Sequence, residues 1–178
     1  GDGRANKVVC IKRFYNELLV WREEKGKDGG CLTLIEGYSP ETFGKRVLST
    51  VLGTFSAKSA VVVEDVPNVD PNEKIVRRTV AVFLSRYGVF MTDGKTVIMI
   101  SDNIQEYFDP KDDKCIRRGY EKEHWIDFDS MYQVIRIGLV SGSTATVPNV
   151  FLVYDVKTGG WGYDELTQPF SCHTEVEG

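Results

Sequence analysis

The two histidines are the first residues to consider for acid–base chemistry, because an imidazole titrates near neutral pH. They are His124 and His173, and neither belongs to a catalytic motif. His124 lies between Glu123 and Trp125 at the start of an alternating run, where a surface or strand-edge position is expected. The sequence also lacks G-x-S-x-G, H-E-x-x-H and G-x-x-x-x-G-K-[ST]. These observations predict a protein that is not an enzyme.

Two groups of carboxylates have spacings that binding or catalytic sites use. Asp127 and Asp129 are two residues apart, so they share one face of a strand, and paired carboxylates serve glycosidases. Phe128 between them is expected to face the core, which favours a solvated strand edge for both carboxylates. The acidic cluster in residues 109–113 offers oxygen ligands for Ca²⁺ but lacks the EF-hand spacing and its closing Glu, so a solvated loop is favoured.

Aromatic rings could stack on sugars, although rings in strands this apolar are expected to form core. The residues in question are Trp21, Trp125, Trp161, Tyr38, Tyr132, Tyr154 and Tyr163. Trp125 stands two residues before the paired carboxylates. Trp125, Asp127 and Asp129 are therefore the candidate glycan site of this sequence.

Composition predicts an ordinary globular protein without a metal or other cofactor. The 178 residues are 42% hydrophobic and 27% charged, with a net charge of −4. An acidic balance argues against sequence-specific nucleic-acid binding, and no apolar run approaches the roughly 18 residues of a membrane helix. The four cysteines (Cys10, Cys31, Cys115 and Cys172) form no CxxC pair, so buried or half-buried thiols are expected rather than disulfides or zinc ligands.

Short apolar or alternating runs are separated by turn residues along the whole chain, which is typical of all-β proteins. The expected strands cover residues 7–12, 17–21, 31–36, 46–52, 59–64, 75–84, 89–91, 96–100, 124–128, 132–140, 149–156 and 161–163. Long loops are expected at 22–30, 65–74, 110–123 and 141–148. The sequence therefore predicts a single all-β domain over residues 1–178, built as a sandwich, a barrel or a propeller.

One tight turn and one short helix stand out from this pattern. Asp93-Gly94 lies between two apolar runs and predicts a hairpin, because glycine readily takes the positive φ that such a turn needs. A helix is expected over residues 101–108, where Asp102 and Gln105 fit a capping box. Its apolar face is expected to consist of Ile104, Tyr107 and Phe108.

Two segments resemble hairpins of known β-propellers. Residues 153–161 (VYDVKTGGW) resemble the V-Y-D-x-x-T-G-x-W hairpin of kelch-like blades. Residues 85–108 resemble the pattern S-x-x-G-[IV]-[FY], then D-G, then I-S-x-x-I, which is typical of β-propeller-like proteins in bacteriophage tails. Residues 8–21 resemble the first strand pair of their blades. The motif positions are Gly88, Phe90, Asp93, Gly94, Ser101, Ile104, Tyr107, Phe108, Tyr154, Asp155, Gly159 and Trp161.

The resemblance implies a virion structural protein, similar to the tail hub, nozzle or stabilisation proteins of short-tailed phages. Such a protein is made in the host bacterial cytoplasm and acts in the virion tail, through contacts with other tail or connector subunits. It implies a homo-oligomeric ring around the tail channel. It also implies a fold of about three propeller-like antiparallel blades, which are fewer than a closed propeller needs. We therefore expect a fragment or processed part of a longer chain, an open array completed by other chains, or another β fold with blade-like hairpins.

Two other functions fit the same sequence. One is a carbohydrate-binding or glycoside-cleaving propeller, which would use Trp125, Asp127 and Asp129 at a central pocket. The other is a kelch-like protein-interaction module, which would remain monomeric with a complete set of blades in its parent chain.

Overall fold

The computed structural model describes residues 6–24, 29–37, 39, 41–67 and 77–163. Within these residues the chain forms twelve strands in three four-stranded sheets, with three short 3₁₀ helices between them. The prediction of an all-β fold with one short helix near residues 101–108 is confirmed.

Each sheet is built from four strands that are consecutive in the chain. Sheet I contains β1 (Val8–Phe14), β2 (Glu17–Arg22), β3 (Cys31–Glu36) and β4 (Gly44–Ser49). Sheet II contains β5 (Ala60–Pro67), β6 (Arg77–Ser85), β7 (Gly88–Thr92) and β8 (Val97–Met99). Sheet III contains β9 (Trp125–Asp129), β10 (Val134–Leu139), β11 (Val150–Asp155) and β12 (Trp161–Tyr163). The 3₁₀ helices are η2 (Ala57–Ser59), η3 (Asp102–Tyr107) and η4 (Glu121–Glu123).

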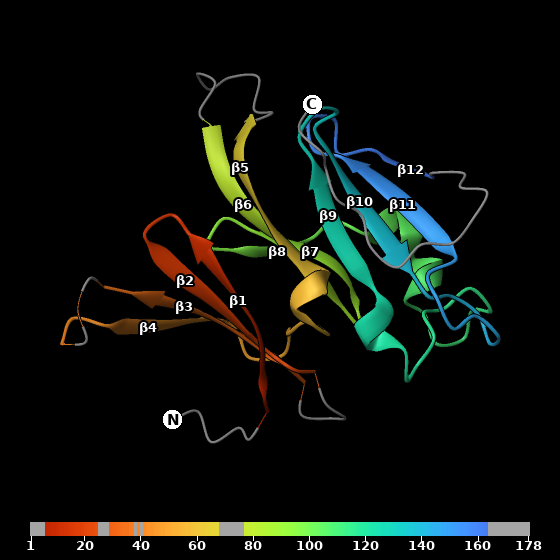
Figure 1. Cartoon of the computed structure of the whole chain (residues 1–178), viewed down its shortest axis with the longest axis horizontal. Helices are drawn as coiled ribbons and strands as arrows, with labels where there is room; N and C mark the ends of the chain where they lie inside the picture. The colour runs from red at the N-terminus through yellow and green to blue at the C-terminus, as the bar shows by residue number, and fades with distance from the viewer. Residues whose placement is uncertain (1–5, 25–28, 38, 40, 68–76, 164–178) are drawn as a thin grey trace.

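All three sheets are antiparallel meanders, and sheet II lies between the other two (Figure 1). Neighbouring strands in each sheet are therefore consecutive in the chain, which keeps contacts within a sheet local. The sheets neither curl nor close on themselves, so they form an open stack in this structure.

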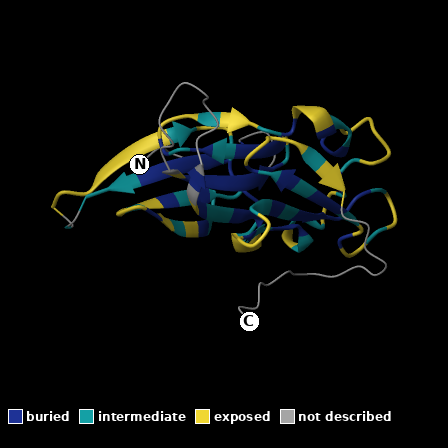
Figure 2. Cartoon of the chain, turned by 90° about the horizontal axis from the view of Figure 1, so that it is seen from above, coloured by how far each residue is buried: buried dark blue, intermediate teal, exposed yellow. Residues whose placement is uncertain are grey.

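The central strand β6 explains why the stack holds together. Ala81 and Phe83 point to the cluster shared with sheet I, whereas Val82 and Leu84 point to the cluster shared with sheet III. Successive side chains of a strand face opposite sides of its sheet, so a run that is apolar throughout is what a strand covered on both sides needs. Figure 2 shows buried residues through the middle of the molecule and exposed residues along its outer strands.

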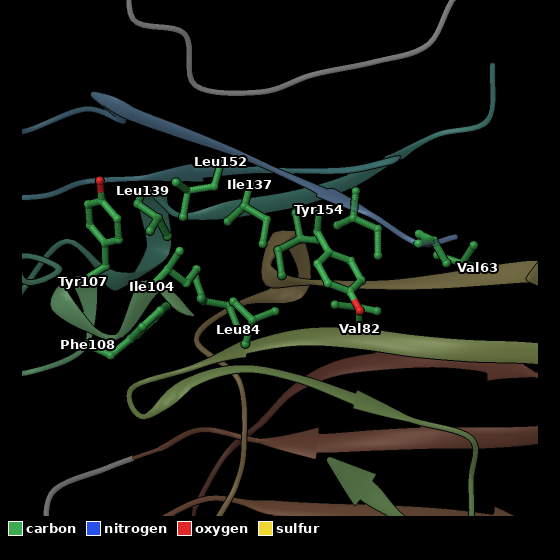
Figure 3. Packing of buried hydrophobic residues seen from close by; sticks show 14 of the residues in the cluster. Val63, Val82, Leu84, Ile104, Tyr107, Phe108, Ile137, Leu139, Leu152 and Tyr154 are labelled. Carbon is green, nitrogen blue, oxygen red and sulfur yellow. The ribbon is translucent and has the colours of Figure 1, made fainter. Parts of the chain in front are cut away.

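The two apolar clusters differ in character. The cluster between sheets I and II is rich in aromatic rings, with Trp21 and Phe83 in edge contact at 5.8 Å and Phe83 stacked on Phe90. The cluster between sheets II and III is mainly aliphatic, and Ile137 and Leu152 lie above Leu84 in it (Figure 3). Burial of this apolar area is the main stabilising term for both interfaces.

Helix η3 seals one end of the second cluster. Its expected apolar face is confirmed, because Ile104, Tyr107 and Phe108 are all buried there (Figure 3). The expected capping box is wrong. The Gln105 amide instead donates to the carbonyl and hydroxyl oxygens of Ser101, both at 3.2 Å. The Ser101 hydroxyl also accepts from Val89 N–H at 3.0 Å, which ties the helix to β7.

The expected turn at Asp93-Gly94 joins β7 to β8. Asp93 Oδ1 accepts hydrogen bonds from the backbone N–H groups of Lys95 and Thr96 at 2.9 and 2.8 Å. Partial burial alone would raise the pKa of Asp93, but these hydrogen bonds outweigh it and lower that pKa. Gly94 has φ 82°, and a Cβ there would lie 2.7 Å from the Phe14 ring of sheet I.

Several expected boundaries are corrected. The strand expected at 132–140 begins at Val134, because Gln133 takes a positive φ of 57° in the turn. The strand expected at 46–52 is β4, which covers Gly44–Ser49. Strand β5 ends at Pro67, so it extends into the loop expected at 65–74. The rest of that loop, Tyr38, Cys172 and His173 lie outside the described residues. In the expected loop at 22–30, Glu24 and Gly30 are buried rather than exposed.

Candidate functional site

The residues of the candidate glycan site share the outer face of sheet III, the face turned away from sheet II. Antiparallel pairing places Trp125 opposite Gly138, Asp127 opposite Arg136, and Asp129 opposite Val134. Phe128 and Ile126 point the other way and contact the core, as expected for Phe128. The structure therefore brings the three predicted residues together on one surface.

Trp125 does not offer a free stacking platform. Its side chain is only 3% exposed and its ring lies against Gly138, where an added Cβ would meet ring atoms at 2.3 Å. The ring of Phe151 lies beside it at 6.3 Å. The expectation that this ring belongs to a packed region is confirmed, and the same holds for Trp21 and Tyr154. It is wrong for Tyr132 and Tyr163, which are exposed.

Asp129 is buried and ion-paired, so the expectation of a solvated carboxylate is wrong for this residue. Its Oδ2 lies 3.1 Å from Arg136 Nη2, and its Oδ1 accepts from Tyr132 N–H at 3.1 Å. Both oxygens therefore hold the β9–β10 turn in place. Asp127 is half-buried, and its Oδ1 accepts the N–H of Phe128 at 2.9 Å. These contacts fit a carboxylate pair that organises a hairpin.

His124 is fully buried, which corrects the expectation of a surface or edge histidine. Its Nδ1 accepts a hydrogen bond from Val140 N–H at 3.1 Å, so the ring is neutral and its proton is on Nε2. Its ring lies 5.5 Å from that of Phe55. Burial lowers the pKa of His124 to about 4. A histidine in this state holds the β10 end in register rather than moving protons at neutral pH.

The acidic cluster at 109–113 belongs to an exposed loop, as expected. Asp109 Oδ1 accepts from Lys111 N–H, and Asp112 Oδ1 accepts from Lys114 N–H, so both carboxylates shape turns. Across the described parts of the chain, no group of three or more His, Cys, Asp or Glu side chains is placed to hold a metal ion. No helix among the described residues is long and apolar enough to cross a membrane.

The motif at 153–161 acts as a junction between sheets. The rings of Tyr154 and Trp161 lie 4.9 Å apart, and Trp161 Nε1 donates to the Ile100 carbonyl at 2.7 Å. Asp155 Oδ1 accepts from Lys157 N–H, which lowers the pKa of Asp155, and Gly159 takes φ 71° in the turn. The hairpin of sheet III is therefore tied to the segment that precedes η3.

The surface best suited to binding is the outer face of sheet I, which sequence reasoning did not single out. Two cross-strand rows run across all four strands on the side away from sheet II. The first row is Ile11, Val20, Thr33 and Val47, and the second is Arg13, Leu18, Ile35 and Lys45. We call these eight residues the sheet I outer face. Their neighbours Leu19, Leu32 and Leu34 point to the core, which fixes the direction of the rows.

This face is apolar and exposed at the same time. Ile11 is 57% exposed, and Leu18 and Val47 are also exposed, whereas Thr33 within the first row is buried. The charges in its two rows belong to Arg13 and Lys45, and none of the eight described positions is acidic. Contiguous apolar surface of this kind marks contact sites more often than chance. The signal in the sequence was that apolar residues occupy both odd and even positions of β1 and β2. A strand with one solvated face would instead alternate apolar and polar residues.

No protein-family model and no curated protein matches this sequence.

Proposed function

We propose that this chain is a structural, non-enzymatic component of a bacteriophage tail or virion, acting through contacts between subunits. The observation that carries the proposal is the stack of three consecutive four-stranded meanders, in which the middle sheet is covered on both faces. A sheet stack of this kind is a rigid scaffold that presents its ends and turns to neighbours. The blade-like hairpins at residues 85–108 and 153–161 supply the link to tail proteins.

The use of polar side chains in the interior also supports a scaffold role. The buried carboxylates of Glu24 and Asp129 accept hydrogen bonds that join separate segments, and buried His124 holds a backbone N–H. Catalytic sites instead combine titratable groups with an accessible cleft and a reacting partner. In the described residues, these three groups make contacts that stabilise the fold.

We further propose that the three sheets are propeller blades completed by other chains. Each sheet has the four-stranded antiparallel order of a blade, and the sheets follow each other in chain order. Three such blades need further sheets to close a ring, which neighbouring subunits around a tail channel would supply. The proposed partners are therefore other tail or connector subunits and copies of this chain.

Mass spectrometry of gradient-purified phage particles tests this proposal. We expect peptides of this chain to co-purify with the particles in several copies per particle. Its presence only in the particle-free fraction of the host lysate would contradict the proposal.

A second candidate function is glycan binding or cleavage at the outer face of sheet III. It is favoured by one observation, the placement of Trp125, Asp127 and Asp129 on the same face. A glycan array probed with the chain and with Asp127→Asn tests it. Binding or hydrolysis that is lost in the variant would support this candidate, and no binding to any sugar would remove it.

A further inference from the structure

The sheet I outer face is the one broad sheet surface of the stack that combines exposed aliphatic side chains with only basic charges among its described positions. Ile11, Leu18 and Val47 are exposed, whereas the aliphatic side chains of the central strand β6 of sheet II are buried on both of its faces. Exposed area of this kind gains free energy when another surface covers it. The question is which surface does so.

The charge of the described residues is uneven. Those up to residue 59, which include sheet I, contain 7 basic and 5 acidic residues, a net charge of +2, whereas residues 121–163, which include sheet III, contain 3 basic and 5 acidic residues, a net charge of −2. The sheet I outer face lies in the basic part, and sheet III lies in the acidic part. The two ends of the stack therefore carry opposite net charge.

Sheet III also presents apolar side chains next to its carboxylates. Met131 and Tyr132, in the β9–β10 turn, are 77% and 66% exposed, the largest exposures among the large apolar side chains of the described residues. Asp127 lies on the strand that leads into this turn. Asp129 is paired with Arg136, so Asp127 and these apolar side chains are the part of sheet III that complements an aliphatic face carrying Arg13 and Lys45.

We infer that the sheet I outer face binds a second copy of this chain, at the sheet III end that carries Met131 and Tyr132. Opposite charges steer and orient such a contact, and the aliphatic side chains supply the buried area. Pairing of two sheet I outer faces is disfavoured, because it would bring Arg13 and Lys45 of both copies together. The inference deepens the proposed assembly function and rests on it for its role in a particle.

The contact joins two different surfaces, so a dimer keeps one free sheet I outer face and one free sheet III end. Such a heterologous contact extends into a closed ring when its rotation closes and into an open chain when it does not. Because exposed charges are screened by salt, association should weaken as ionic strength rises.

Sedimentation velocity of the purified chain tests the inference with two blocking variants and one control. Ile11→Asp puts a charge on the sheet I outer face, and Met131→Asp puts one on the turn of sheet III. Ile98→Asp is the matched control, because Ile98 is an isoleucine 53% exposed on β8 of sheet II. Circular dichroism confirms that each variant is folded.

We expect the wild-type chain and Ile98→Asp to associate with rising concentration at low salt, and less at high salt. Ile11→Asp and Met131→Asp should each weaken self-association at least about tenfold, the loss typical of a central interface residue. An equimolar mixture of these two variants should form a one-to-one dimer, because each keeps the end that the other has lost.

Three results would overturn the inference. They are a wild-type chain that stays monomeric at roughly 100 μM and low salt, blocking variants that associate like Ile98→Asp, and a mixture that forms no dimer. A monomeric chain that is still found in purified particles would refute this inference and leave the proposed function standing. A self-associating chain that is absent from particles would support this inference and contradict the proposed function.

Discussion

The carboxylate of Glu24 accepts a hydrogen bond of 2.5 Å from the hydroxyl of Ser85, a residue 61 positions further along the chain. The same carboxylate accepts from Gly53 N–H and Arg86 N–H, both at 2.8 Å, and its side chain is fully buried. Glu24 follows β2 of sheet I, Ser85 is the last residue of β6, and Arg86 begins the β6–β7 turn of sheet II. One carboxylate thus joins the two sheets at this edge.

Glu24→Gln should therefore destabilise the fold strongly. An amide has one acceptor oxygen in place of two, so at least one buried donor among its partners loses its acceptor. We expect the free energy of unfolding to fall by about 2–4 kcal/mol. Urea denaturation measures the change. Glu23→Gln, at the neighbouring half-buried position, is the control and should change stability by less than about 0.5 kcal/mol. Equal effects in the two variants would show that the Glu24 contacts contribute little.

Gly138→Ala should disturb the outer face of sheet III. The added Cβ would lie 2.3 Å from the Trp125 ring, so the ring or the strand must move. Overpacking of this kind costs about 1–3 kcal/mol. Gly162→Ala, on β12 of the same sheet, is the matched control because no atom lies within 4 Å of its added Cβ. Thermal unfolding should separate the two variants, and identical melting temperatures would show that Trp125 has room to move.

The stability of the fold should depend on pH through His124. Burial lowers the pKa of His124 to about 4, from an ordinary value of 6.5 in the unfolded chain. Between these two pH values the unfolded state binds more protons, so stability decreases as pH falls through this window and is complete above pH 6.5. The loss over the whole window is about 3 kcal/mol.

Urea midpoints at pH 7 and at pH 4.5 check this expectation in the wild type and in His124→Gln. The glutamine keeps an acceptor for Val140 N–H but does not titrate, so the variant should lose less stability on acidification. A variant with the same pH dependence as the wild type would assign that dependence to other groups.

A charge placed under helix η3 should break the cluster between sheets II and III. Phe108→Asp or Tyr107→Asp would bury a carboxylate among Ile104, Leu139 and their neighbours. Such a change costs several kcal/mol, so we expect unfolded or insoluble protein. Asn103→Asp, at an exposed position of the same helix, is the control and should remain folded. A soluble and fully assembled Tyr107→Asp, Phe108→Asp double variant would show that the helix is peripheral.

Features encoded by neighbouring residues could be predicted from the sequence. Asp93-Gly94 predicts its turn because the conformation of glycine and the Asp93 hydrogen bonds to residues two and three positions later are local. The buried face of η3 follows from the spacing of three apolar residues. The approximate number of strands follows from the same local patterns, whereas the grouping in three sets of four comes from the pairing in the structure.

Features that depend on distant partners could not be predicted. Glu24 lies in a charged segment that suggests exposure, and its donors are 29 to 62 positions away. His124 is buried against Phe55 and the end of β10, although it directly follows the charged segment Glu121–Glu123. The pairing of Asp129 with Arg136 depends on the register of the β9–β10 hairpin. In each case the partner is fixed only after the sheets have formed and stacked.

Electron cryo-microscopy of purified tail particles would test the assembly proposal most directly. We expect density that fits the stack of three sheets, in several copies per particle, with the sheet I outer face covered by a neighbouring subunit. Particles without such a stack, or with Ile11, Leu18 and Val47 facing solvent in every copy, would contradict this account.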